Sequence, residues 1–79
     1  MNINRYIRWY DKENGDIIGE EEIIVSLELI QQEFNVPKEN PMYDCWKIDI
    51  LNLAFLKSSL NQDIDLSKYD YFIEADYEE

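Results

Sequence analysis

The sequence predicts the α+β fold class, with four strands and a short helix in a single domain that spans residues 1–79. Two observations carry this prediction. Three segments alternate apolar and polar residues with the period of a β-strand, and a fourth follows a hairpin turn. One segment between the second and third strands instead spaces its apolar residues like a helix. A chain of this length makes one domain with a modest core.

The first two strands are expected to form a hairpin. Residues 3–10 are β-branched or aromatic at most positions and alternate, which suits a strand. Asn14-Gly15 supplies the positive φ angles that a tight turn requires. Residues 16–24 would then return beside the first strand, with Gly19 as the site of a β-bulge.

The predicted helix follows Ser26, a residue type that caps helix N-termini. Its apolar stripe consists of Leu27, Ile30 and Phe34, at positions i, i+3 and i+7. Asn35-Val36-Pro37 is expected to end the helix, because proline disfavours helical backbone in the residue before it. Residues 35–43 then read as a loop with few apolar anchors.

Two further strands are predicted in the second half of the chain. Residues 44–50 alternate and predict a third strand, and residues 69–77 predict the last one. Residues 51–60 fit either a second short helix or a turn, with a strand that continues part of the way as another alternative. Residues 61–68 are expected to form a loop.

Alternation divides the predicted sheet into two faces. The face expected to bury the helix stripe carries Ile7, Trp9, Trp46, Ile48, Tyr71, Ile73 and Ala75, and the third strand adds Ile50. The opposite face carries Tyr6, Arg8, Tyr10, Cys45, Lys47, Phe72, Glu74 and Asp76. Aromatic residues and a cysteine among charges are typical of a recognition surface. Isolated aromatic residues also form ordinary cross-strand pairs on exposed faces, so both interpretations stay open here.

The chain is strongly acidic, with 18 acidic residues, 7 basic residues, no histidine and a net charge of −11. Because 46% of its residues are hydrophobic, this composition indicates a folded domain rather than a disordered tail. Its negative field attracts a basic partner and repels nucleic acid and anionic membranes. The single cysteine and the absence of an apolar leader or membrane-length segment lead us to expect a cytoplasmic protein.

The residues predict neither an enzyme nor a cofactor. The commonest general base is missing because the chain has no histidine, and Cys45 therefore has no imidazole to activate it. The spacing of an EF-hand loop is partly matched by Asp63, Asp65, Ser67 and Glu74. However, Lys68 stands where that loop requires glycine, so we expect no metal site.

Several short motifs together carry a resemblance. They are, in order, Trp9-Tyr10-Asp11-Lys12, Gly19-Glu20-Glu21, Val36-Pro37, Cys45, Ile64-Asp65, Tyr71-Phe72 and Asp76-Tyr77. Their order and spacing resemble the cloacin/colicin immunity proteins, which neutralise bacteriocins that cleave ribosomal RNA. The chain departs from that family at Asn35, where the family has glycine, and in lacking a Trp-X-Pro after the third strand. The resemblance implies a four-stranded antiparallel sheet with a short helix packed on one face, in agreement with the periodicity.

The resemblance further implies an immunity protein that binds and inhibits a cognate basic ribonuclease domain through its sheet. That domain would belong to a bacteriocin or to a polymorphic or contact-dependent toxin, and the free inhibitor would be a monomer or weak dimer. The alternative is an acidic nucleic-acid mimic that inhibits a restriction or CRISPR-type nuclease. Residues carried over from the family are Tyr10, Asp11, Cys45 and Phe72, and Ile17 stands where the family tends to have an aromatic residue. The full set of expected partner-binding residues adds Glu13, Asp16, Lys47, Glu74 and Asp76.

Overall fold

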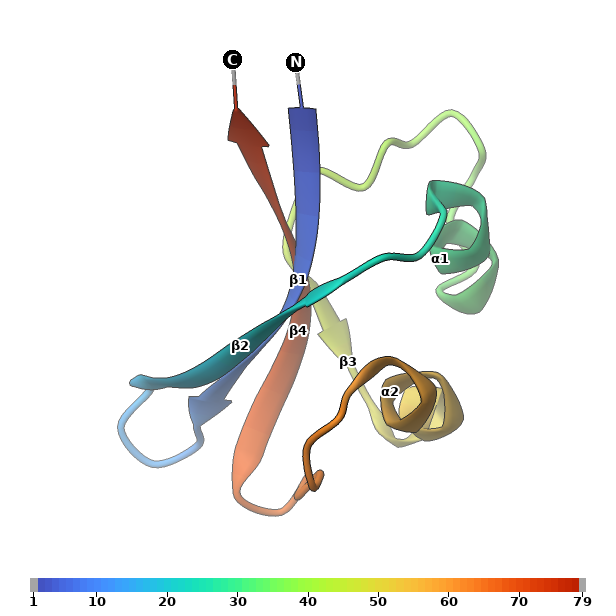
Figure 1. Ribbon diagram of the computed structural model, residues 1–79. Helices are drawn as coiled ribbons and strands as arrows, with labels where there is room; N and C mark the ends of the chain where they lie inside the picture. Colours follow the sequence, from blue (N-terminus) through green and yellow to red (C-terminus); the bar gives the residue numbers. More distant parts are fainter. Residues whose placement is uncertain (1, 79) are drawn as a thin grey trace.

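The computed structural model describes residues 2–78 of the chain and the side chains of residues 3–76. Its elements are β1 (Asn2–Asp11), β2 (Ile17–Ile23), α1 (Leu27–Glu33), β3 (Trp46–Ile48), the 3-10 helix η1 (Ile50–Asn52), α2 (Leu53–Ser59) and β4 (Tyr69–Glu78). The strands form one antiparallel sheet in the order β2-β1-β4-β3. Both α-helices lie on the same side of this sheet (Figure 1). The predicted α+β fold class is confirmed, and residues 51–60 are mostly helical rather than strand.

The predicted hairpin between β1 and β2 is confirmed. The N–H of Asp11 donates to the carbonyl of Asp16 over 2.8 Å, and Gly15 turns the chain with a φ of +77°. The register shifts between the pairs Trp9–Gly19 and Tyr10–Ile17, which leaves Ile18 as the bulged residue beside Gly19. The bulge therefore lies one residue before the predicted position.

Gly19 is needed for a different reason than bulge formation. The indole ring of Trp9 lies against its Cα, and a Cβ added there would come closer to that ring than van der Waals contact allows. The absence of a side chain at Gly19 therefore lets Trp9 pack across the hairpin. The ring also stacks on Tyr71, with centroids 5.8 Å apart, and so joins β2 to the centre of the sheet.

The core lies between the sheet and the two helices. Its buried apolar residues are Ile7, Ile23, Ile30, Val36, Met42, Ile48, Leu56, Leu60, Tyr71 and Ile73. The Ser26 cap is confirmed, because its Oγ accepts from the N–H of Leu29, and Ile30 from the predicted stripe is fully buried. Leu27 and Phe34 are half-buried and pack against the same core. The inner face predicted from alternation thus provides most of the sheet's contribution to the core.

The third strand is shorter than predicted, and one of its expected core residues is on the surface. Asp49 begins η1: its carboxylate accepts from the N–H of Leu51, and the side-chain oxygen of Asn52 accepts from the N–H of Asp49. This reciprocal cap turns the chain out of the sheet after Ile48. Ile50, predicted to face the core, is therefore 65% exposed.

The loop at residues 35–43 is better anchored than its sequence indicated. Met42 has a φ of +55° and is only 1% exposed, so it enters the core from this loop. The Arg5 guanidinium donates to the carbonyls of Pro41 and Met42, each over 2.8 Å. The buried side chain of Gln31 donates to the carbonyl of Asn40 over 2.6 Å. These bonds fasten the loop to β1 and α1.

Tyr77 belongs to the motifs that carry the family resemblance, and its side chain lies outside the described residues. Within residues 2–78, no helix has both the length and the apolar character needed to cross a membrane.

Candidate functional site

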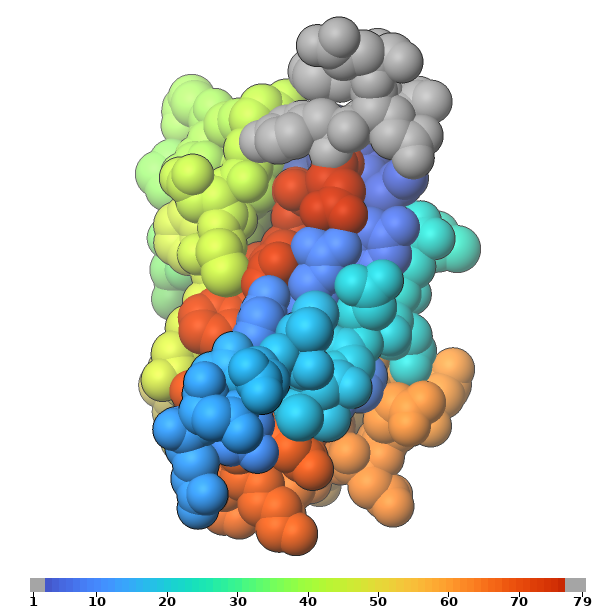
Figure 2. Space-filling view, turned by 90° about the vertical axis from the view of Figure 1, so that its left-hand side faces the viewer, coloured from blue at the N-terminus to red at the C-terminus, as the bar shows by residue number. Residues whose placement is uncertain are grey.

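The face of the sheet turned away from the helices, here called the outer face, gathers most of the predicted partner-binding residues. β1 and β4 form its centre, and Figure 2 looks onto this side, with the two strands side by side in blue and red. Ladder pairing places Arg8 opposite Phe72 on one side and Glu20 on the other. Directly opposite residues on antiparallel strands share a face, so long-range partners meet here.

A single arginine organises the acidic part of this face. Arg8 Nε contacts Glu20 Oε1 over 2.9 Å, Nη1 contacts Glu74 Oε1 over 3.0 Å, and Nη2 contacts Asp76 Oδ2 over 2.7 Å. Its guanidinium carbon also lies 4.6 Å from the centre of the Tyr6 ring. We call Arg8 with its three carboxylates the Arg8 cluster. Because one cation faces three anions, the cluster is joined by hydrogen bonds and still carries negative charge.

An aromatic centre lies beside this cluster. The Tyr10 hydroxyl donates to Glu74 Oε2 over 2.7 Å, and the Cys45 thiol donates to the same oxygen over 3.4 Å. The rings of Tyr10 and Phe72 meet edge to face, with centroids 5.6 Å apart. We call Tyr10, Phe72 and Cys45 the aromatic centre. Glu74 connects it to Arg8, since the two oxygens of that carboxylate bind the two groups separately.

These contacts determine which groups are charged. The Arg8 hydrogen bond lowers the pKa of Asp76 below its usual range. Burial alone would raise the pKa of Glu74, but hydrogen bonds from Tyr10, Arg8 and Cys45 outweigh burial and lower it. The hydrogen bond to Glu74 raises the pKa of Tyr10 to about 12. Loss of solvation and the nearby Glu74 carboxylate raise the pKa of Cys45 to about 11. At neutral pH the carboxylates of Glu74 and Asp76 are therefore ionised, and the thiol of Cys45 is protonated.

The end of the outer face near the hairpin turn has a different charge balance. Lys12 Nζ donates to Asp70 Oδ1 over 2.9 Å, and Lys47 Nζ lies 3.6 Å from the same oxygen. The hydrogen bond from Lys12 lowers the pKa of Asp70. Two cations share one carboxylate here, whereas three carboxylates share one cation at the Arg8 cluster. The ratio of cations to carboxylates within the ion pairs therefore differs between the two ends of the outer face.

The structure brings together only some of the predicted site residues. Tyr10, Cys45 and Phe72 form the aromatic centre, and Glu74 and Asp76 belong to the Arg8 cluster. On the flanks of this group, Lys47 pairs with Phe72 in the ladder, and Ile17 pairs with Tyr10.

The acidic residues predicted in the hairpin turn are placed differently. The Asp11 carboxylate accepts from the N–H groups of Glu13 and Asn14, so it stabilises the turn itself. Glu13 and Asp16 are exposed in that turn, outside the Arg8 cluster. Their charges contribute to the field of the molecule rather than to the organised patch.

Sequence reasoning missed the residues that organise the site. Arg8 was placed on the correct face but was not among the predicted partner-binding residues. That set also lacked Glu20, which was named only in a motif, and Asp70, which was placed only in the last strand. A two-residue turn at Asn14-Gly15 would pair Arg8 with Glu21. The turn that forms and the register shift beside it place Glu20 opposite Arg8 instead, so local sequence did not reveal this partner. Asp70 and Glu74 could be assigned to Lys12 and Arg8 only once the β1–β4 pairing was known.

Among the described side chains, no group of three or more histidine, cysteine or acidic residues is arranged to hold a metal ion.

Comparison with known proteins identifies a family but no activity. No curated protein matches the chain. Residues 4–74 match a family described as a domain of unknown function, DUF7683. This match spans the chain from β1 into β4 and includes the Arg8 cluster up to Glu74. The chain therefore belongs to the DUF7683 family.

Proposed function

We propose that this protein is an immunity protein, which binds the basic ribonuclease domain of a toxin through its outer face and blocks access to RNA. One observation carries the proposal: an aromatic centre and a hydrogen-bonded acidic cluster lie side by side on one sheet face of a chain with net charge −11. The resemblance to cloacin/colicin immunity proteins implies binding through the sheet, and three of the residues carried over from it, Tyr10, Cys45 and Phe72, lie on this face.

The aromatic centre has the properties of an interface core. Tyrosine and other large aromatic residues are enriched among residues that dominate binding energy. Phe72 is held edge to face by Tyr10, whose hydroxyl is in turn fixed by Glu74. Side chains that are already ordered lose less conformational entropy on binding, so this arrangement favours tight association.

The Arg8 cluster supports recognition of a basic partner. Each carboxylate oxygen accepts more than one hydrogen bond, so Glu20 and Asp76 can bind Arg8 and a partner's arginine or lysine together. About half of each side chain is exposed, at 50% and 48%. The remaining acidic residues extend the negative field beyond the contact and steer a cationic domain toward it. We expect association at about 10⁸–10⁹ M⁻¹s⁻¹ at low salt.

We propose inhibition by binding alone, without catalysis by this chain. A nucleophilic cysteine requires a lowered pKa, whereas the pKa of Cys45 is raised to about 11. Cys45 is also free and exposed, a state that is stable in a reducing compartment, which supports action in the cytoplasm. The thiol fits better as part of the aromatic centre than as a reactive group.

The test is a binding experiment with the basic domain encoded at the end of a neighbouring toxin gene. Phe72→Ala should weaken binding by about 2 kcal/mol, mainly through faster dissociation. Leu51→Ala is the matched control, since Leu51 is 86% exposed in η1 and lies outside the outer face. Raising the salt concentration should slow association for both variants and for the parent protein.

Different outcomes separate this proposal from its alternative. An association rate that does not respond to salt contradicts the electrostatic part of the proposal. Unchanged binding by Phe72→Ala, with graded losses when Glu20, Glu22 and Asp76 are each changed to the amide, would favour nucleic-acid mimicry instead. A mimic depends on the spacing of many charges, whereas an immunity interface depends on a few central side chains.

A further inference from the structure

A second surface lies on the helix side of the molecule, at the groove where β2 leads into α1. This groove has a volume of about 530 Å³ and runs between the end of β2, α1 and α2. Its apolar lining includes Ile24, Leu29 and Phe55. We call it the Ile24 groove. It contains no residue of the Arg8 cluster or the aromatic centre.

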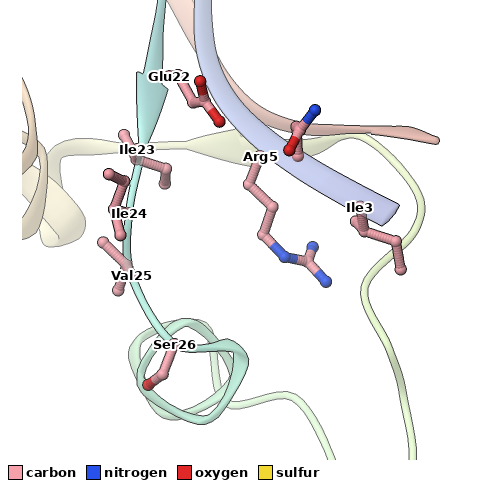
Figure 3. A pocket seen from close by; sticks show the side chains of 8 residues that line it. Ile3, Arg5, Glu22, Ile23, Ile24, Val25 and Ser26 are labelled. Carbon is pink, nitrogen blue, oxygen red and sulfur yellow. The ribbon is translucent and has the colours of Figure 1, made fainter. Parts of the chain in front are cut away.

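Two apolar residues that line this groove are largely open to solvent. Ile24 is 98% exposed and Leu29 is 57% exposed, although both are large aliphatic residues. A second hollow of about 400 Å³ lies against the same stretch of chain. Figure 3 shows that hollow, with Ile23 at the end of β2 and Ile24 and Val25 on the segment that leads to α1. Single exposed aliphatic residues are common, but exposed residues that converge on one groove mark an interaction site.

The rim of the groove is acidic and held in position. Glu21, Glu22 and Glu33 line it, and no lysine or arginine is among its described lining residues. The Glu21 carboxylate accepts from the N–H of Asn61 over 3.3 Å, and the Glu33 carboxylate accepts from Asn52 Nδ2 over 2.9 Å. Both donors are neutral amides, so they fix the two carboxylates without cancelling their charge. The rim therefore differs from the Arg8 cluster, where a cation is built in.

We propose that the Ile24 groove docks a short basic segment of another protein, with one apolar side chain in the groove and flanking lysine or arginine residues on its acidic rim. The charge of the groove argues against a second copy of this chain, because two copies of net charge −11 repel each other. The groove is separate from the outer face, so this inference does not depend on toxin binding by that face.

The proposal can be tested by NMR titration of the isotope-labelled full chain with a blocked Lys-Lys-Leu-Lys-Lys peptide. The backbone signals of Ile24, Leu29 and Phe55 should shift and saturate. A Lys-Lys-Ser-Lys-Lys peptide should bind about tenfold more weakly, because it keeps the charge but buries no apolar side chain. A Glu-Glu-Leu-Glu-Glu peptide should cause no saturable shift, because its charge opposes that of the rim.

Matched variants locate the contact. Ile24→Ser should weaken the Lys-Lys-Leu-Lys-Lys peptide about tenfold, and its melting curve should match that of the parent because the side chain is exposed. Leu51→Ser, at a residue that is 86% exposed outside the groove, should bind as the parent does. Glu21→Gln, which keeps an acceptor for the N–H of Asn61 but removes the charge, should weaken binding and reduce its salt dependence. Equal binding by Ile24→Ser, equal binding of the serine peptide, or shifts confined to Tyr10 and Phe72 would overturn the proposal.

Discussion

The two faces of the sheet come from the same alternation of residues, yet they are held together by different forces. On the inner face, Ile7 and Ile48 are at most 1% exposed and pack against helices through contacts that need no direction. On the outer face, the side chains of Arg8 and Glu74 are only 15% and 17% exposed, although no helix covers this face. Their order comes from hydrogen bonds of defined geometry. The stability of the inner face therefore depends on how completely its side chains fill the core. The stability of the outer face depends on individual hydrogen-bonding atoms.

This difference bears on how the outer face could bind. Acidic residues on an exposed sheet are usually mobile, and ordering them on binding costs free energy. Here Arg8 has already ordered Glu74 and Asp76, and Glu74 has ordered Tyr10. The same contacts therefore stabilise the fold and prepare a surface for a basic partner. Four substitutions test this comparison between the faces.

The largest expected effect is on the inner face. Ile7→Ala should lower the free energy of unfolding by about 4 kcal/mol, because Ile7 is fully buried and its replacement leaves a cavity. Urea unfolding followed by fluorescence measures this loss, which should be nearly the same at low and high salt. A loss below about 1 kcal/mol would mean that the core collapses onto the cavity and does not depend on volume as described.

The matching change on the outer face is Arg8→Met, which keeps a long apolar stem but removes the cation. It should lower the free energy of unfolding by about 2–3 kcal/mol at low salt, because three carboxylates are left without their partner. Lys38→Met, at an exposed loop residue, is the control and should change stability by less than about 0.5 kcal/mol.

The Arg8→Met effect should also depend on salt and pH, unlike that of Ile7→Ala. The pKa values of Glu74 and Asp76 are lowered in the folded protein, so their contribution is present above their ordinary values and is lost as pH falls through the lowered ones. The gap between parent and variant should therefore be largest near neutral pH and shrink below about pH 4. A gap that is constant from neutral to acid pH contradicts an electrostatic origin.

A smaller effect is expected where β2 meets the inner face. Gly19→Ala should cost about 1–2 kcal/mol, because the new methyl group collides with the Trp9 ring and forces it to move. A change in tryptophan fluorescence should accompany the loss. In a Trp9→Phe background the same substitution should cost less, which a double-mutant cycle would show. Equal costs in both backgrounds would mean that backbone conformation, rather than the ring contact, requires glycine.

The smallest expected effect concerns the hydrogen bond that joins the aromatic centre to the Arg8 cluster. Tyr10→Phe should cost about 1 kcal/mol at pH 7, because it removes the hydrogen bond to Glu74 and little packing. The pKa of Tyr10 is raised to about 12, so the stability from this bond is present below about pH 10 and is lost as pH rises toward 12. Urea midpoints of parent and variant should therefore converge at high pH. A difference that persists there would assign the effect to packing.

The sequence predicted the elements of this fold well because their signals are local. Alternation, the Asn14-Gly15 turn and the Ser26 cap each act within a few residues, and the structure has the corresponding strands, hairpin and helix. The errors fell where a local contact competed with the pattern. Asp49 caps a 3-10 helix and exposes Ile50, although alternation continues through both residues. Met42 reaches the core from a loop that has no periodicity to reveal it.

The same distinction between local signals and long-range contacts applies to the candidate site. The sequence by itself determined the charge of the chain and the composition of each sheet face, since both follow from residue identity and a period of two. Only the tertiary structure decided which charges meet. Arg8 reaches Glu74 and Asp76 across 66 and 68 positions of sequence, and this requires β1 to pair with β4 in one register. Register is set by packing of the whole inner face, because a slip of one residue would turn every buried side chain outward.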